Sequence, residues 1–330
     1  MSWMYRVGIN HRNRGYDTGK RVTKLDRPVI SVGNLSTGGT GKTPMVHLIV
    51  GMLQRQGHRP AIAMRGYGAK PGQKGDEQLE HEQALPGVPV VAQPDRLAGL
   101  RALFTTESGV GIDCVVLDDG FQHRKVARDL DIVLIDASRP PDRDALLPRG
   151  HLREPLGSLS RAGLVVLTHA ERVGAGELDR LRAMVARYNA LVPVLTARHA
   201  WDGFGMYRRV SDRWIEDVVR PEQLRGSSAR VVCGIGNSGA LVDMVRAAGI
   251  EPRTVVSLRD HARIDRATVA GLVAPENQSA DEPVLMTRKD WVKACRDPAW
   301  PPGSRVIVPS LRMETDDARE LDRLIRAIFD

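Results

Sequence analysis

The strongest chemical signal in the sequence is a glycine-rich segment, Ser36–Thr43, with the order Ser-Thr-Gly-Gly-Thr-Gly-Lys-Thr. An apolar run at 29–32 precedes it and a helical pattern follows it, which is the context of a phosphate-binding loop. The backbone N–H groups of such a turn, with the positive end of the helix, form a cradle for triphosphate oxygens. We therefore predict a nucleotide site formed by eight residues: Ser36, Thr37, Gly38, Gly39, Thr40, Gly41, Lys42 and Thr43.

Two residues of this loop have separate chemical roles in the prediction. Lys42 would reach the β- and γ-phosphates, and the Thr43 hydroxyl would bind Mg²⁺. Ser36 departs from the strict pattern, which has glycine at that position. The alternative is a glycine-rich turn with an incidental lysine, and the strand, turn and helix context favours nucleotide binding over it.

A pair of carboxylates, Asp118 and Asp119, directly follows the apolar run at 114–117. Two adjacent carboxylates at the end of a buried strand are costly unless a cation or a hydrogen-bond network meets them. Mg²⁺ bound to a triphosphate would supply that cation, so we assign the pair to the metal side of the site together with Thr43. The alternative is a simple turn at Asp119-Gly120 with Asp118 as a cap.

Short apolar runs alternate with helical patterns from Pro28 onward, which predicts an α/β fold with a doubly wound, mostly parallel sheet of the phosphate-loop NTPase type. A helix should follow Thr43 and stop at Gly57. In an open parallel sheet, ligands bind outside the carboxyl ends of the strands. We therefore expect the polar segments after these runs to share one edge with the phosphate loop: 65–68, 118–123, Asp136 and 168–171. The remaining histidines, for example His47 and His58, are not part of any recognisable group of catalytic or metal-binding residues in the sequence.

A second set of apolar runs and helical patterns begins near residue 200, which predicts a second, smaller α/β lobe. We divide the chain into a basic N-terminal segment at 1–27, a core at 28–200 and a C-terminal lobe at 201–330 that closes over the active-site cleft. The pattern at 316–329 predicts a helix, and the sequence does not say which lobe holds it.

The charge of the chain is +8, and most of the excess lies in residues 1–27, whose net charge is 7 − 2 = +5. Aromatic and apolar residues at Trp3–Ile9 precede these charges, a combination suited to an anionic membrane surface. A solvated terminus is the equal alternative, and nucleic-acid binding would rest on charge alone. No apolar run is long enough to cross a bilayer and no secretory signal is visible, so we expect a cytoplasmic protein. The three cysteines are far apart and indicate neither disulfides nor a zinc site.

Six motifs in order resemble the tetraacyldisaccharide 4′-kinase family. They are Val32–Thr43, Arg65–Gly68, Gly75–Glu77, Leu117–His123, Leu147–Pro155 and Met286–Asp290. The resemblance implies transfer of the ATP γ-phosphate to the 4′-hydroxyl of a tetraacyldisaccharide 1-phosphate, a step of lipid A biosynthesis. It also implies a peripheral enzyme on the cytoplasmic face of the inner membrane that acts on a lipid substrate and does not bind nucleic acid.

The resemblance also implies residue roles. Asp76 and His261 would form the catalytic pair, and Asp118 and Asp119 would serve the Mg²⁺ and phosphate site. A proton acceptor in line with the sugar hydroxyl and charge neutralisation at the γ-phosphate agree with this division. The alternative function is a phosphate-loop NTPase that acts as a switch or partner-loading factor without a lipid substrate; in its dimeric members a lysine often stands where this chain has Thr37.

Overall fold

The computed structural model describes residues 2–66, 74–234, 238–258, 264, 266–273 and 282–330. Its chain forms two compact units, one made of 1–199 and 313–330 and the other of 200–312. The first boundary agrees with the predicted division near 200. The predicted lobe of 201–330 needs a correction, because the last helix packs its buried Leu321 and Ile325 into the core of the first unit.

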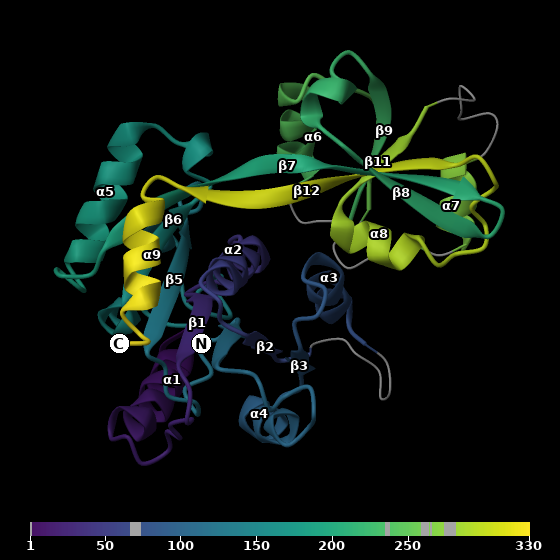
Figure 1. Ribbon diagram of the computed structural model, residues 1–330. Helices are drawn as coiled ribbons and strands as arrows, with labels where there is room; N and C mark the ends of the chain where they lie inside the picture. The colour runs from purple at the N-terminus through teal and green to yellow at the C-terminus, as the bar shows by residue number, and fades with distance from the viewer. Residues whose placement is uncertain (1, 67–73, 235–237, 259–263, 265, 274–281) are drawn as a thin grey trace. The chain divides into compact units, whose positions relative to one another are not determined.

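The first unit contains a parallel sheet with the strand order β7-β6-β5-β1-β4-β2-β3 (Figure 1). The pairing of neighbouring strands is parallel throughout, which confirms the predicted doubly wound sheet. The apolar runs of the sequence at 29–32, 61–64, 114–117, 132–135 and 164–167 each lie within a strand of this sheet. A further run at 88–92 extends two residues before its strand. The strands are β1 (Val29–Asn34), β2 (Pro60–Met64), β3 (Val90–Ala92), β4 (Cys114–Asp118), β5 (Leu130–Asp136), β6 (Leu164–Thr168) and β7 (Val194–Val210).

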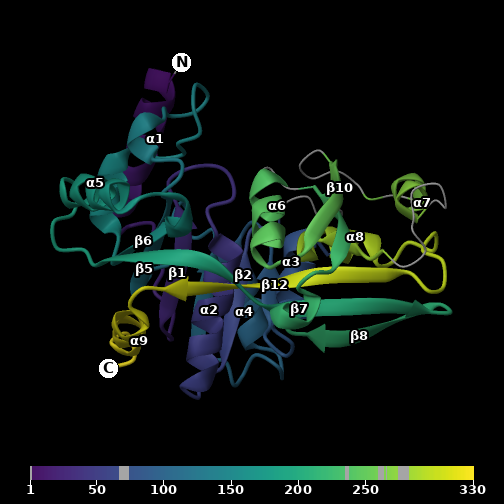
Figure 2. The ribbon, with the colours of Figure 1, turned by 90° about the horizontal axis from the view of Figure 1, so that it is seen from above.

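Helices cover both faces of this sheet because successive strand residues alternate between the faces. Residues such as Ile132 and Val166 pack with α2 (Lys42–Arg55) and α9 (Ala318–Arg326), whereas Val133 and Val165 pack with α5 (Ala175–Ala186). Figure 2 shows α5 and α9 on opposite sides of β6. Two further helices, α3 (Asp76–Ala84) and α4 (Arg96–Phe104), connect the strands β2, β3 and β4.

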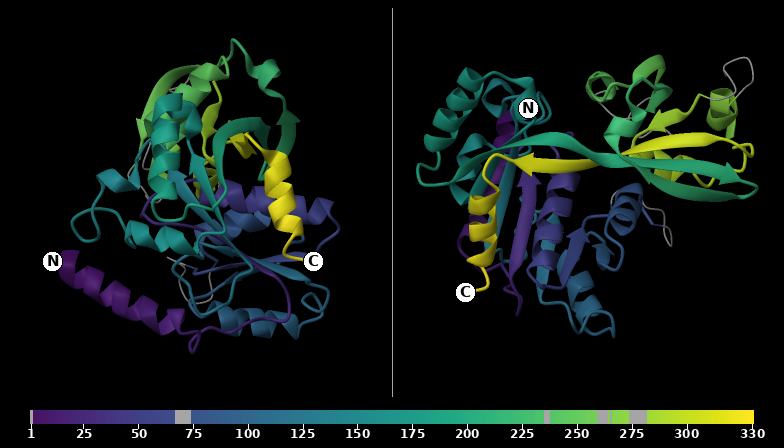
Figure 3. Two further views of the ribbon diagram at one scale, coloured as in Figure 1. Left: turned by 90° about the vertical axis from the view of Figure 1, so that its left-hand side faces the viewer. Right: turned by 45° about the horizontal axis from the view of Figure 1, so that its top comes forward.

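The N-terminal segment forms helix α1 (Ser2–Asp17), which lies on the α5 side of the sheet (Figure 3). Asn13 is buried, and its amide donates a 3.1 Å hydrogen bond to Glu154, a carboxylate with no exposed side-chain surface. Tyr5 donates to the Arg153 carbonyl at 3.2 Å. The expectation of a solvated, frayed terminus is therefore wrong for these residues, because polar side chains hold the helix on the core. The part of the chain that the structure describes contains no helix long and apolar enough to span a bilayer.

In the second unit, β9 (Ser228–Cys233) lies between β10 (Glu251–Ser257) and β11 (Val284–Met286), and β11 also pairs with β12 (Arg305–Thr315). These four strands are parallel, and β8 (Arg213–Val219) pairs antiparallel with β7. Helix α6 (Ser238–Ala247) packs on one face, and α7 (Arg266–Val273) and α8 (Arg288–Ala294) pack on the other. Residues 201–214, interpreted from the sequence as a change of domain, contain the end of β7 and the start of β8.

Candidate active site

The phosphate loop lies between β1 and the first turn of α2, as the sequence predicts. Its backbone adopts left-handed conformations at Gly38 (φ 110°) and at Gly41 (φ 82°), which caps the helix. Residues other than glycine rarely adopt these backbone angles. A Cβ on Gly41 would also lie 2.8 Å from Met313 Cε and 3.3 Å from the His199 ring. The left-handed conformation therefore favours glycine at position 41, and a larger residue would also have to displace the end of the Met313 side chain.

The carbonyl and hydroxyl groups of the loop are held by residues behind it. Asn34 donates to the Thr40 hydroxyl at 2.7 Å, and the Thr168 hydroxyl donates to the Thr40 carbonyl at 3.0 Å. His169 Nε2 lies 3.4 Å from the Gly39 carbonyl. Residues 168–169 therefore lie at the same edge as the phosphate loop, as the strand order predicts. These hydrogen bonds hold the loop carbonyls away from the anion site. The first N–H groups of α2 have no carbonyl one turn before them, so they remain available to an anion.

Asp118 ends β4 and is the centre of a buried chain of side chains. Its Oδ2 lies 3.0 Å from His81 Nε2, and His81 Nδ1 lies 3.0 Å from His47 Nε2. Burial raises the pKa of Asp118, but the hydrogen bond and charge of His81 lower it below its ordinary value overall. Burial opposes protonation of His81, and the contact with Asp118 outweighs this and raises its pKa. Asp118 is therefore held as a carboxylate.

Sequence reasoning missed both histidines of this chain. His81 lies on α3 and is 37 positions from Asp118, and His47 lies on α2, a further 34 positions from His81. No local pattern joins residues at such separations. The sequence offered one weak signal, which is that His81 lies five positions after Asp76 of the motif at 75–77.

Asp119 has two cationic neighbours. Lys42 Nζ lies 3.7 Å from its Oδ1, and Arg153 donates to its Oδ2 at 2.7 Å. Burial raises the pKa of Asp119, whereas Lys42 and Arg153 lower it below its ordinary value overall. The residue follows the last residue of β4 and has a left-handed backbone (φ 50°). The two adjacent carboxylates are thus separated by different partners.

Arg153 was quoted in a motif but given no role from the sequence. Its guanidinium contacts the Ser36 carbonyl at 3.2 Å and Asn34 Oδ1 at 3.0 Å, in addition to Asp119. It therefore joins the end of β1, the phosphate loop and the loop after β4. The motif at 147–155 could have indicated this residue, because an arginine with several donors is suited to joining loops that carry acceptors.

The carboxylates have oxygen atoms that could bind a cation. Asp118 Oδ1 and Asp119 Oδ1 are buried and have no hydrogen-bond partner among the described residues. A buried carboxylate oxygen without a partner is costly. Thr43 lies in the first turn of α2, beside Lys42. Oxygen donors of this kind fit the hard cation Mg²⁺.

The predicted catalytic pair is placed only in part. Asp76 is the first residue of α3 and is half-buried, and the same helix carries His81 to Asp118. His261 lies outside the described residues, as do positions 67–73 of the loop after β2. The pairing of Asp76 with His261 therefore stays a prediction.

Comparisons with known proteins identify the family of the chain. The sequence model of the family described as tetraacyldisaccharide-1-P 4′-kinase matches residues 1–330. A tetraacyldisaccharide 4′-kinase of Anaeromyxobacter dehalogenans strain 2CP-1 is 33% identical, with 98% of this chain and 87% of the relative covered. That of Geobacter metallireducens is 34% identical, with 89% and 86% covered.

A solved structure extends the agreement to three dimensions. The crystal structure of the "apo" form of LpxK from Aquifex aeolicus in complex with ATP has a TM-score of 0.75 and 30% identity, and the match covers 100% of this chain and 97% of that one. The resemblance inferred from six motifs is thereby confirmed. The chain belongs to the tetraacyldisaccharide-1-phosphate 4′-kinase family.

Proposed function

We propose that this chain performs the reaction of its family with ATP and Mg²⁺ bound at the phosphate loop and the two carboxylates after β4. Family membership makes it an ATP-dependent phosphotransferase of lipid A biosynthesis that acts on a tetraacyldisaccharide. The observation that carries the assignment of the site is the position of Lys42, which lies in the first turn of α2 and 3.7 Å from Asp119. This lysine is placed between the phosphate cradle and the candidate metal ligands.

Thr43, Asp118 and Asp119 are the residues that would hold Mg²⁺. Asp118 Oδ1 has no hydrogen-bond partner in the described structure, and Asp119 Oδ1 has only the ion pair with Lys42 at 3.7 Å. When bound, the ion neutralises charge that develops on the transferred phosphoryl group. Lys42 supplies a second positive charge to the β- and γ-phosphates. Asp119 holds Lys42 in place in the absence of nucleotide, because the ion pair is only partly exposed.

The acceptor hydroxyl needs a base as well as an oriented phosphate. We assign this role to His261, with Asp76 as its carboxylate partner. Asp76 begins α3, the helix that also delivers His81 to Asp118. One helix would then link the base to the metal side of the site. The switch alternative offers no use for a base of this kind.

The N-terminal region supports a peripheral contact with a membrane surface. Arg14, Lys20, Arg21 and Lys24 are exposed on or just after α1. A cavity of about 630 Å³ adjoins this helix, lined by arginines such as Arg124 and Arg161 and by leucines such as Leu152 and Leu156. Cationic and apolar groups together suit a phosphorylated lipid at the cytoplasmic face of the inner membrane.

Lys42→Ala should abolish phosphate transfer and weaken ATP binding, because both the phosphates and Asp119 lose their cation. We expect the rate of formation of the bisphosphorylated lipid to fall by about 10²-fold to 10³-fold. The assay is purified protein with Mg-ATP and the tetraacyldisaccharide 1-phosphate. Lys125→Ala, at an exposed lysine 3.7 Å from Asp95, is the matched control and should retain transfer. If the unaltered protein instead hydrolyses ATP on addition of a partner and forms no phosphorylated lipid, the result would favour the alternative function as an NTPase switch.

Asp76→Asn and His261→Ala should each lower kcat by about 10²-fold to 10⁴-fold with little change in ATP affinity, because a general base acts on the acceptor. Steady-state kinetics with ATP titrated at saturating lipid separates the two effects. Glu77→Gln, the next residue of the same helix turn, is the control for Asp76. Full turnover in either variant would show that the base is assigned wrongly.

His81→Asn should raise the Mg²⁺ concentration needed for half-maximal activity about 10-fold or more, because residues that orient a metal ligand typically contribute that much to affinity. The measurement is the Mg²⁺ dependence of kcat at fixed ATP. His58→Gln is the control, since His58 contacts Asp113 at 3.1 Å in an exposed pair. An unchanged Mg²⁺ dependence would mean that His81 has a purely structural role.

Replacing Lys20, Arg21 and Lys24 by glutamate should weaken binding to vesicles that contain phosphatidylglycerol by about 100-fold, since each basic residue near an anionic surface contributes about 1 kcal/mol. Co-sedimentation with such vesicles and with phosphatidylcholine alone measures this. Glutamate at Arg101, Arg187 and Arg319, which are also exposed, gives the same change in net charge and should bind normally. Equal loss in both triple variants would refute a local membrane contact.

A further inference from the structure

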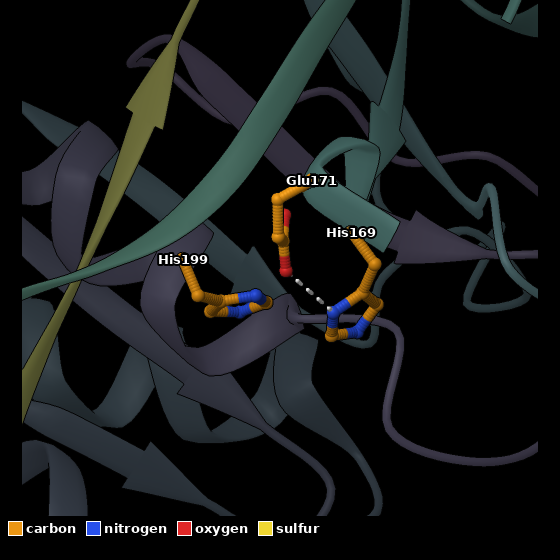
Figure 4. A group of neighbouring side chains, drawn as sticks. All are labelled: His169, Glu171 and His199. Atoms are coloured by element: carbon orange, nitrogen blue, oxygen red, sulfur yellow. Dashed lines mark ion pairs between the residues drawn. The ribbon is translucent and has the colours of Figure 1, made fainter. Parts of the chain in front are cut away.

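A second group of ligand-type side chains lies behind the phosphate loop. His169 follows β6, Glu171 lies two residues further on, and His199 lies on β7 (Figure 4). β6 pairs in parallel with Val194–Thr196 at the start of β7, so the end of β6 lies beside the early part of β7 that carries His199. One donor atom from each residue lies within 4.8 Å of the other two. All three belong to the first unit of the chain.

The donor atoms of this group are poorly satisfied as they stand. His169 Nε2 faces the Gly39 carbonyl at 3.4 Å, and a proton there leaves an unshared electron pair on Nδ1. That Nδ1 lies 3.7 Å from Glu171 Oε1, another acceptor. The Nδ1 atoms of His169 and His199 are buried and have no hydrogen-bond partner among the residues that the structure describes. A metal ion between these nitrogens and the Glu171 carboxylate would satisfy all three groups together.

The rings of His169 and His199 pack with centroids 4.5 Å apart. A neutral imidazole is the form that binds metals. Arg172 offers Glu171 a partial countercharge at 3.7 Å, on the exposed side of the group. That contact leaves the buried histidine nitrogens without a partner.

We propose that His169, Glu171 and His199 bind a divalent transition-metal ion of the zinc class. Two imidazoles and one carboxylate are a common set of protein ligands for Zn²⁺, with water in the fourth position. In a tetrahedral site the donors lie about 3.3 Å apart, so 3.7 Å between His169 and Glu171 requires only a small adjustment. Glu171 has one third of its side chain exposed, which gives the ion a route of entry and room for water.

The proposed site is distinct from the Mg²⁺ site. Mg²⁺ prefers oxygen ligands in octahedral geometry, whereas imidazole nitrogen selects Zn²⁺, Ni²⁺, Co²⁺ or Cu²⁺. The ion would fix His169, whose Nε2 contacts Gly39, and His199, whose ring packs against Gly41. An ion bound here would therefore brace the phosphate loop from behind. This inference does not depend on the proposed function, because the site needs neither nucleotide nor lipid.

The test is metal binding to the full chain, freed of metal and kept without nucleotide or lipid. Titration calorimetry with Zn²⁺ should give one site per chain, and Co²⁺ should give the intense visible absorption of a tetrahedral ion with nitrogen and oxygen ligands. His199→Ala and Glu171→Gln should each weaken Zn²⁺ binding at least about 10-fold. Zn²⁺ should raise the Tm of the unaltered chain and leave that of the variants unchanged.

The matched control is His151→Ala. His151 and Asp144 form a pair at 3.1 Å on the surface, and the His151 side chain is 74% exposed. This variant should keep the affinity of the unaltered chain. Glu171→Gln keeps the size of a partly exposed side chain, so a folding defect cannot account for its loss of binding. Three results would each overturn the proposal. They are the absence of stoichiometric Zn²⁺ binding, variants at His199 or Glu171 that bind Zn²⁺ as tightly as the unaltered chain, and a Co²⁺ spectrum dominated by thiolate bands.

Discussion

The site depends on one constraint: a loop that offers its N–H groups to an anion must have its carbonyl groups bound elsewhere. In this chain the Thr40 carbonyl accepts from Thr168, and the Gly39 carbonyl faces His169. Thr168 ends β6 and His169 follows it, and β6 is two strands away from β1 in the sheet. The cradle is therefore a product of strand order as much as of its glycines. A loop with the same eight residues on another sheet would lack these supports.

A second constraint is the cost of holding two carboxylates side by side at a buried strand end. The structure meets it by giving each carboxylate its own cationic or proton-bearing partner, His81 for Asp118 and Arg153 with Lys42 for Asp119. The two carboxylates have different hydrogen-bond partners, and Lys42 adds positive charge near both of them. One oxygen of each carboxylate is left for a ligand, so the same arrangement that stabilises the charges also prepares the site.

The sequence predicted what local patterns encode. The loop at 36–43, the apolar runs within β1 and β5, and the position of the aspartates at the end of β4 follow from residue order alone. It did not reveal His81, Arg153 or the group around His169, because their partners are brought together by tertiary contacts across many positions. The long strand β7 was also missed, since Asp202, Gly203 and Gly205 interrupt the apolar alternation. The last helix was predicted, but only packing assigns it to the first unit.

The edge of the sheet thus carries two donor sets that differ in chemistry. Near Lys42 the donors are hard oxygens from Asp118, Asp119 and Thr43, whereas behind Gly39 two of the three are imidazole nitrogens. Since ion choice follows ligand type, one surface can hold two kinds of cation without exchange between them. The backbone of the phosphate loop separates the sets. Any ion on the far side would act on the nucleotide only through the positions of Gly39 and Gly41, by restricting the loop instead of adding charge to the phosphates.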